Sequence, residues 1–496
     1  MAGSDLVWGQ PPLAIAVLAH LALWSLAPGI LFGNLHADTL EAAYWGRDLA
    51  LGYAKHPPLA TWLLDAALRS GLPPVFSLML LSQVGMTVAA FYLWKSVRLY
   101  ASPRTAALAV LLFLTSPAAT IYGVQVNHNS LLSPFWAAAM YHGLAFLEER
   151  RWPDAIGLAI AAGLGLITKY EMAFLLASLV ALAALVPRFR PAFATPASYA
   201  CVGLFLVVVA PHVWWLQANG WPSASRAMGA DKMHNVATLN LSGVNAIVGL
   251  FTLFVSPVAI LYATMNRRAG TRDARGPDVK LIGQVLTFGP PVVLLAGALL
   301  TLQIVKPLWV LSLTSSVAAG LALLFGAGSR ESGLSERTTA RILACLSAAI
   351  FAGFTIYLLV AGAVGKPLAA YSADSRKLAA ATLGIWTEHG EDPLRCVVIA
   401  DRKIGPSGVL FLPGRPDFVD FSSPSWSTKR QIEACRKTGG VAVLASNTTE
   451  LDNFPAACRG QTRRFDLPAM PGMGRVTWPF DLVYIPPEGS TCDARR

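Results

Sequence analysis

The sequence has 496 residues, of which 54% are hydrophobic and only 14% are charged, and its mean hydropathy is +0.51. Soluble globular domains carry roughly 25% charged residues, so this composition excludes that class. The net charge of +11 does not indicate a nucleic-acid partner. The basic residues stand in short loops between apolar segments, which is the distribution found on the cytoplasmic side of membrane proteins.

Apolar segments of about 20 residues recur along the chain and predict transmembrane helices. No charged segment precedes the first one, so we expect it to be retained rather than cleaved as a signal peptide. We expect about 11 spans, at residues 12–32, 73–94, 105–122, 130–147, 154–167, 172–187, 198–215, 244–264, 281–302, 307–326 and 342–361.

The loops on the two sides of these spans differ in basic residues. One side receives 15 Lys and Arg residues and the other receives seven, so the richer side is predicted to be cytoplasmic. The segments that then face the exterior are the loops 33–72, 123–129 and 216–243, the turns at 169 and 303–306, and everything after 361.

The first exterior loop, residues 33–72, concentrates acids, bases and aromatics between two spans. Apolar residues recur at helical spacing over 40–51, and Gly52 is a suitable helix end. The Pro57-Pro58 pair is suited to open a second helix, because proline is tolerated in a first turn. We therefore expect two short amphipathic helices on the membrane surface.

The composition changes to that of a small soluble α/β domain from about residue 370. We expect a transmembrane catalytic domain over 1–365 and an exterior α/β domain over 366–496. The elements expected in the second domain are a helix over 372–389, a strand over 396–400, a helix over 427–438, a strand over 441–445 and a last strand near 481–485.

Four of the six cysteines, Cys396, Cys435, Cys458 and Cys492, fall in this exterior segment. They permit two disulfides with three connectivities, and an oxidising compartment favours their formation. The other two cysteines lie inside apolar spans and are expected to be packing residues.

The motifs of the first exterior loop resemble those of a known family. They are Asp38, Arg47, Leu49, Gly52-Tyr53 and His56-Pro57-Pro58-Leu59. They are similar to the first exterior loop of membrane glycosyltransferases of the GT-C type, with the bacterial families thirty-nine and eighty-three as the most similar. The run Asp38-Thr39-Leu40-Glu41-Ala42 with Trp45-Gly46-Arg47 most resembles the lipopolysaccharide galacturonosyl transferases. Further matches are Thr168-Lys169-Tyr170, Pro211 with Trp214-Trp215, and Lys306-Pro307-Leu308-Trp309.

This resemblance implies an α-helical polytopic membrane protein of the GT-C type. It further implies an inverting glycosyltransferase in the bacterial inner membrane with its site on the periplasmic side. A polyprenyl phosphate such as undecaprenyl phosphate would carry the sugar, and an envelope molecule such as lipid A or lipopolysaccharide core would accept it. Galacturonic acid is the sugar that the resemblance favours. The alternative is a transporter or flippase of lipid-linked sugars, which usually shows the internal repeats that this sequence lacks.

Transfer from a lipid phosphate needs a base for the acceptor hydroxyl and cations for the departing phosphate. Asp38 is our candidate general base, with a helix N-cap as its alternative role. Glu41, one turn further on, is a candidate to assist Asp38 or to position the acceptor. Its alternative is a place on a solvated helix face.

Cations, amides and aromatics of the exterior loops are candidates to bind the phosphate and sugar of the donor. The set is Arg47, Tyr53, Lys55, His56, Asn127, His128, Lys169, Tyr170, Arg226, Lys232, Lys306 and Trp309. Structural alternatives stand beside several of them. Arg47 could form a salt bridge with Glu41 or Asp48, Lys169 could extend to the membrane surface, and Lys306 with Trp309 could be interfacial anchors. Lys55 and His56 could contact lipid headgroups or pack in the turn, and the 216–243 loop could be a lid or an inert surface loop.

A divalent metal held by His128 with Asp38 or His36 is the remaining alternative for this site. Many relatives carry an Asp-Glu pair where this chain has Asp38-Thr39, and an acid where it has Asn127-His128-Asn129. The second departure weakens the case for a metal-binding acid pair, and we name no cofactor.

Overall fold

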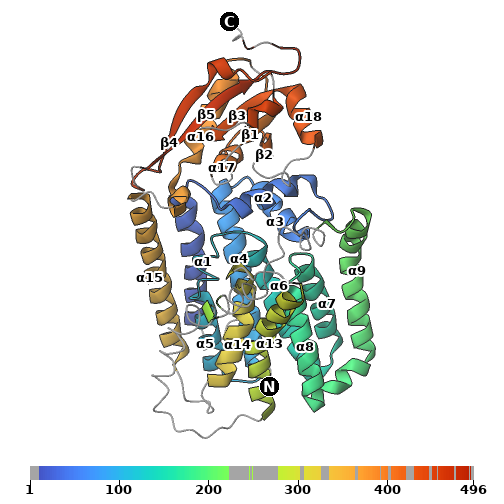
Figure 1. Ribbon diagram of the computed structural model, residues 1–496. Helices are drawn as coiled ribbons and strands as arrows, with labels where there is room; N and C mark the ends of the chain where they lie inside the picture. The colour runs from blue at the N-terminus through green and yellow to red at the C-terminus, as the bar shows by residue number, and fades with distance from the viewer. Residues whose placement is uncertain are drawn as a thin grey trace. The chain divides into compact units, whose positions relative to one another are not determined.

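The computed structural model shows a mostly helical chain with one small sheet near its C-terminus (Figure 1). The residues it describes are 11–222, 245, 248–249, 277–301, 307–325, 334–363, 367–390, 392–399, 404–420, 429–445, 450–454, 456–473, 476–490 and 492. The chain divides into two compact units, each built from separate segments. Unit 1 is Met1–Ser25, Asp48–Leu64 and Leu80–Phe351, and unit 2 is Leu26–Arg47, Asp65–Met79 and Ala352–Arg496.

A helix lies at every expected span within the described residues, because a segment in lipid must satisfy its backbone N–H and C=O groups internally. The expected span 244–264 falls almost entirely outside them. The helices are α1 (Pro11–Leu31), α4 (Pro74–Arg98), α5 (Pro103–Leu114), α6 (His128–Glu149), α7 (Trp152–Leu166), α8 (Met172–Leu185), η2 (Pro187–Ala194), α9 (Pro196–Ala218), α13 (Pro277–Thr301), η5 (Pro307–Leu313), α14 (Thr314–Phe325) and α15 (Glu336–Ala363).

Their lengths differ from the expectation of about 11 full spans. Among the described helices, α1, α4, α9, α13 and α15 are long and apolar enough to cross a membrane, and α8 with η2 makes a sixth if this pair, bent by 113°, is one span. The apolar helices α5, α7 and α14 are shorter. In α5 the helix ends at Leu114 instead of continuing to 122, because Pro117 follows and proline disfavours helix in the residue before it.

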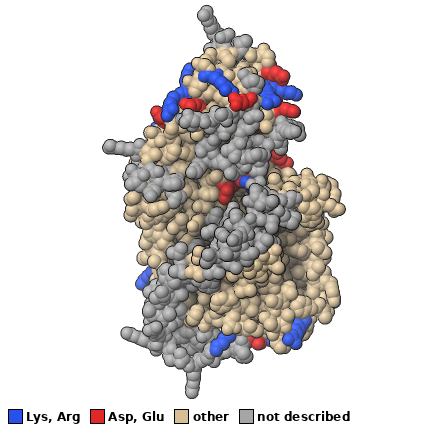
Figure 2. Space-filling model, in the orientation of Figure 1, with Lys and Arg blue, Asp and Glu red and all other residues tan. Residues whose placement is uncertain are grey.

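The outer surface of the helical region is apolar. On α9, Tyr199, Leu206, Val207 and Trp214 are each more than half exposed. Figure 2 shows few charged groups on this region, with Lys and Arg at its lower edge. An exposed apolar surface of this extent suits lipid, and the chain is a multi-pass membrane protein.

The first exterior loop forms two short helices, α2 (Ala37–Trp45) and α3 (Leu59–Leu68), with the single turn η1 (Gly46–Asp48) after α2. The prediction that Gly52 ends the first helix is wrong, because α2 already ends at Trp45. Gly52 instead allows a close approach: a Cβ atom there would lie 2.3 Å from the Trp215 indole. Residues 39–45 of α2 are all buried, so this helix has no solvated face of the kind its pattern predicts.

The C-terminal segment forms one five-stranded sheet in unit 2. Its strands are β1 (Cys396–Ile399), β2 (Asp417–Asp420), β3 (Gly440–Ala445), β4 (Arg463–Pro468) and β5 (Thr477–Ile485), in the order β2-β1-β3-β5-β4. β1 pairs parallel with β2 and β3, and β5 pairs antiparallel with β3 and β4. The predicted strands β1, β3 and β5 are confirmed, whereas β2 and β4 were not predicted.

Helices cover this sheet. They are η6 (Pro367–Ser372), α16 (Ser375–Thr387), α17 (Gly405–Leu410), α18 (Lys429–Thr438), η7 (Glu450–Asn453) and η8 (Arg459–Gln461). The two predicted helices are α16 and α18. α18 packs on β1 and β2, while α16 contacts β3, β4 and β5. β1 and β3 are buried along their length, as expected for central strands covered on both faces.

The prediction of two disulfides is confirmed, with the pairs Cys396–Cys435 and Cys458–Cys492. The first joins β1 to α18, and its cysteines are 39 positions apart. Cys201 and Cys345 are free thiols. Cys201 is half-buried, whereas Cys345 is exposed, so the expectation of a packing residue is wrong for Cys345.

We expect only two thiols of the denatured, unreduced protein to react with a maleimide reagent, and six after reduction. The Cys396→Ala/Cys435→Ala variant should lose about 4 kcal/mol of stability, because opening the bridge restores freedom to the unfolded chain. Urea-dependent proteolysis of the full-length protein measures this loss, with Cys201→Ala as the control. Six reactive thiols before reduction would contradict the pairing.

Candidate functional site

The turn at residues 53–58 is held in place by backbone hydrogen bonds within unit 1. Tyr53 N donates to His56 O over 3.1 Å, and Leu59 N donates to Ile167 O over 2.9 Å. The second bond ties the first exterior loop to the junction between α7 and α8. Two motifs that are far apart in the sequence, at His56 and at Lys169, therefore belong to one local structure.

His56 stacks on His128, with ring centroids 4.0 Å apart and an interplanar angle of 29°. His128 precedes the expected span 130–147 and is 4% exposed. Burial, assisted by the charges of Lys169 and Lys55, lowers the pKa of His128 to about 3. The imidazole is therefore neutral, and its Nε2 atom has no hydrogen-bond partner among the described residues.

Lys169 is buried rather than extended to the membrane surface, so the alternative of surface contact is wrong. Its Nζ lies 2.5 Å from Glu171 Oε2, and both side chains are less than 10% exposed. Nζ also donates to Asn129 Oδ1. A buried ammonium needs such partners, because removal from water without them is costly.

Glu171 is a site residue that the sequence analysis missed. It lies at the N-terminal end of α8, and burial raises the pKa of its carboxyl group while Lys169 opposes this. An acid two positions from Lys169 at a membrane junction is itself a signal of function. We call Lys55, His56, His128, Asn129, Lys169 and Glu171 the unit 1 polar cluster.

Other residues that were predicted to bind the sugar donor have partners within the protein. Asn127 caps α6, and its Oδ1 accepts from Asn129 N over 2.9 Å. Tyr170 OH lies 2.9 Å from His212 Nε2, and His212 Nδ1 lies 2.8 Å from Leu51 O. This chain of contacts joins α9 to the first exterior loop and includes His212, which the sequence analysis did not single out.

Three further residues predicted to bind the sugar donor lie outside the described residues: Arg226, Lys232 and Lys306. Trp309 is partly buried and packs against the hydrophobic core of unit 1. Tyr53 is buried, with 8% exposure.

The predicted catalytic acids lie on α2 in unit 2. Asp38 is not the N-cap of this helix, since His36 holds that position and its Nδ1 accepts from Asp38 N over 3.3 Å. The Asp38 side chain is 49% exposed and lies 3.8 Å from His36 Nδ1. Burial lowers the pKa of His36, and Asp38 opposes this. Glu41 is only 4% exposed, so the alternative of a solvated face is wrong.

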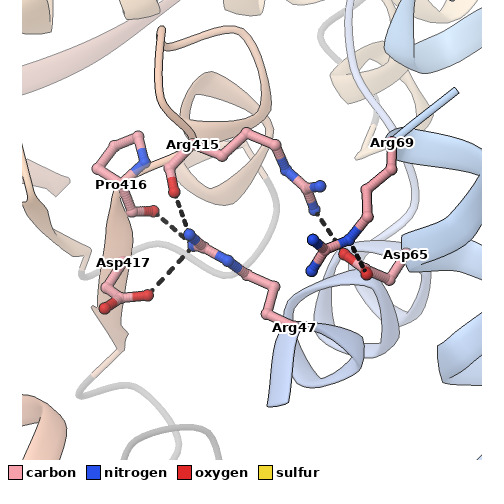
Figure 3. Close-up of polar contacts among 6 residues, drawn as sticks. All are labelled: Arg47, Asp65, Arg69, Arg415, Pro416 and Asp417. Atoms are coloured by element: carbon pink, nitrogen blue, oxygen red, sulfur yellow. Dashed lines mark hydrogen bonds and ion pairs between the residues drawn. The ribbon is translucent and has the colours of Figure 1, made fainter. Parts of the chain in front are cut away.

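Arg47 points to the segment 415–417 of unit 2 (Figure 3). Its guanidinium donates to Pro416 O over 2.8 Å and to Arg415 O, and it pairs with Asp417 over 3.2 Å. The alternative of a salt bridge with Glu41 or Asp48 is therefore wrong. These contacts fix Arg47 to the first residue of β2 and to the loop before it.

Figure 3 also shows a second set of ion pairs in unit 2, which shares Arg415 with the contacts of Arg47. Asp65, with a side chain 2% exposed, accepts from Arg69 and lies 3.2 Å from Arg415 Nη2. Burial lowers the pKa of Arg415, and Asp65 opposes this. The two arginines supply the charge that a buried carboxylate requires.

The unit 1 polar cluster has the composition of an anion site. It offers the ammonium groups of Lys55 and Lys169, the second already paired with the Glu171 carboxylate, beside a neutral imidazole and an amide. Hydrogen bonds to charged groups are strong where water has little access. In the part of the chain that the structure describes, no group of three or more His, Cys, Asp or Glu side chains is placed to hold a metal ion.

Residues 55–215 match the model of the family described as dolichyl-phosphate-mannose-protein mannosyltransferase. Every member of the unit 1 polar cluster falls in this segment, which is about a third of the chain.

Relatives that share sequence with the chain include two proteins from Rhizobium johnstonii. The lipid A galacturonosyltransferase RgtD is 28% identical over 183 residues, which are 37% of this chain and 38% of RgtD. The lipopolysaccharide core galacturonosyltransferase RgtA is 26% identical over 246 residues, 48% of this chain and 49% of RgtA. The matches therefore span half or less of these relatives.

Among solved structures, ArnT from Cupriavidus metallidurans bound to undecaprenyl phosphate superposes with a TM-score of 0.55 at 13% identity. The match covers 96% of this chain and 98% of ArnT. The chain thus has the polytopic fold of the GT-C type that the sequence motifs predicted. These similarities give no support to the alternative of a transporter or flippase.

We expect Glu171→Gln to destabilise the protein by about 3 kcal/mol, because it leaves Lys169 buried without an opposite charge. Lys169→Met should cost a similar amount by stranding Glu171, whereas the Lys169→Met/Glu171→Leu double variant should lose much less than the sum. Thermal unfolding in one detergent measures this coupling. Glu149→Gln, in an exposed pair with Arg151, is the matched control and should change little. Additive losses in the double variant would contradict the coupling.

Proposed function

We propose that this multi-pass membrane protein of the GT-C type is an inverting glycosyltransferase that moves a sugar from a polyprenyl phosphate to an envelope glycolipid. The similarity to two galacturonosyltransferases supports galacturonic acid as the sugar and lipid A or lipopolysaccharide core as the acceptor. The fold shared with ArnT, whose structure holds undecaprenyl phosphate, supports the class of carrier.

The observation that carries this proposal is the buried ammonium of Lys169. It is enclosed by Asn129 and Glu171, with Lys55 close enough to act on the same imidazole, His128. A phosphate entering this place would meet Lys55 and Lys169, and it would compete with the Glu171 carboxylate for Lys169. In low-dielectric surroundings the attraction of opposite charges is far stronger than in water. The role of the cluster is to hold the donor phosphate and to stabilise its charge as it departs.

The proposed reaction is a single displacement. The acceptor hydroxyl oxygen attacks the anomeric carbon while the bond from this carbon to the phosphate oxygen breaks. The hydroxyl proton passes to Asp38, and the polyprenyl phosphate leaves as an anion. Since this leaving group is already stable as an anion, no general acid is required. Glu41 is proposed to assist Asp38. Both assignments rest on the positions of these two residues in the first-loop motif.

We further propose that the protein lies in a bacterial inner membrane with the first loop on the periplasmic side. The excess of Lys and Arg in the opposite loops supports this orientation. The two disulfides support an oxidising compartment for the α/β segment. In this proposal residues 1–365 carry the transfer reaction and 366–496 form a periplasmic domain.

Asp38→Asn should lower turnover by about 10²–10⁴-fold while leaving binding of undecaprenyl phosphate unchanged, because only proton transfer is lost. The experiment compares envelope glycolipids by mass spectrometry in cells that lack the protein and cells that express each variant. Asp48→Asn, an exposed acid on the same loop, is the control and should restore the glycolipid. Full restoration by Asp38→Asn would exclude this residue as the base.

Lys169→Met and Lys55→Met should each weaken binding of undecaprenyl phosphate by roughly 10–100-fold. This corresponds to the binding free energy lost with one hydrogen bond to a charged group. Binding to the purified proteins measures this. Lys95→Met, which removes a cation from the last turn of α4, outside the unit 1 polar cluster, should bind as the wild type does. Wild-type affinity in both cluster variants would overturn the assignment of the phosphate site.

A further inference from the structure

An apolar cavity of about 260 Å³ lies within unit 1, between α6, α7, α8, η2 and α9. Its walls are apolar side chains such as Phe146, Leu158, Leu179 and Phe205. A cavity without polar partners does not hold ordered water, so its natural occupant is hydrocarbon.

The cavity reaches the outer surface of the helices. Three of its lining residues, Val180 on α8, Phe193 on η2 and Val202 on α9, are 58%, 48% and 57% exposed. They belong to the apolar surface that suits lipid, so a hydrocarbon chain can enter from the bilayer without crossing water.

Basic side chains stand at one end of this cavity. Arg150 follows directly on the last turn of α6, which carries Phe146 and Leu147 of the wall, and Arg190 lies two residues before Ala192 of the wall. Figure 2 shows Lys and Arg groups at the lower edge of the helical region, where Figure 1 places the lower ends of α8 and α9.

Two of the four arginines near this end are neutralised by acids. Arg188 pairs with Glu148 over 2.7 Å and with Asp278 over 2.9 Å. Arg151 pairs with Glu149 over 3.0 Å and with Asp154 over 3.4 Å.

The other two make no ion pair among the described residues. Arg150 donates to Arg188 O over 3.4 Å, and Arg190 donates to Ala184 O over 3.0 Å. An apolar cavity open to lipid, beside two guanidinium groups that make no ion pair among the described residues, offers contacts to both the chain and the phosphate of an anionic lipid.

We propose that this cavity binds one acyl chain of an anionic membrane phospholipid, whose phosphate contacts Arg150 and Arg190. The site is separate from the unit 1 polar cluster. Lys169 precedes α8 and the basic end follows it, and 14 helical residues span about 21 Å. The phospholipid belongs to the leaflet that η2 faces, and it braces α9 against α7 and α8.

The test uses the full-length protein in detergent, with native mass spectrometry during titration by phosphatidylglycerol or phosphatidylcholine of identical chains. We expect one phosphatidylglycerol per chain, bound about tenfold more tightly than phosphatidylcholine. Arg150→Gln/Arg190→Gln should remove this preference, whereas Arg151→Gln, whose arginine is already paired, should keep it. Equal binding of the two lipids by the wild type would overturn the role of the arginines.

Filling the cavity tests the acyl-chain part. Ala162→Leu, at a buried position of the wall, should lower the affinity for both lipids at least tenfold, whereas Ala200→Leu, on the exposed side of α9, should not. A second measurement leaves the wall unaltered: Cys201 lines the cavity, so phosphatidylglycerol should slow its reaction with an apolar thiol reagent in a Cys345→Ala background. Unchanged labelling at saturating lipid would exclude occupation of the cavity.

Discussion

The structure depends on the pairing of charges that have been removed from water. In unit 1, Lys169 is enclosed by Glu171 and Asn129, and in unit 2, Asp65 is enclosed by Arg69 and Arg415. Breaking such a pair costs several kcal/mol, because the remaining charge stays buried. The contacts of Lys169 with Asn129 and of Asp65 with Arg415 join segments distant in sequence, so each group of charges fixes local geometry. Of the two, the first lies beside a second ammonium group, that of Lys55, and a neutral imidazole, and this is what supports its proposed role in binding a phosphate.

Hydropathy predicted the helical elements well, because lipid leaves the backbone few alternatives to the helix. It predicted lengths less well, since Pro117 ends α5 early and a bend separates α8 from η2. In the C-terminal segment the apolar strands β1, β3 and β5 were predicted. The strands at the two edges, β2 and β4, were missed because their sequences, DFVD and RRFDLP, are rich in charge. Edge strands commonly carry such residues, which hide their pattern.

The candidate site was predicted as a set of residues and not as a set of contacts. His56, His128 and Lys169 were each named from the sequence, yet the stacking of the two imidazoles and the pairing with Glu171 depend on the fold. Arg47 was named for the donor, whereas its structural partners are some 370 residues away, beyond the reach of any local pattern. The local sequence around Gly52 predicts a helix end. It does not indicate the close contact of Gly52 with Trp215, which is equally non-local.

Unit 2 is assembled from three pieces of chain, and this sets an order for biosynthesis. Tyr44 on α2 packs on Phe418 and accepts a hydrogen bond from Gln431, which is 387 positions later. At about 5–20 residues per second, the ribosome reaches Gln431 roughly 20–80 s after Tyr44. During that interval the first exterior loop is already made but lacks the contacts that bury α2. The segment with the predicted catalytic acids is therefore among the first parts synthesised, whereas its contacts with Phe418 and Gln431 form only after those residues are made.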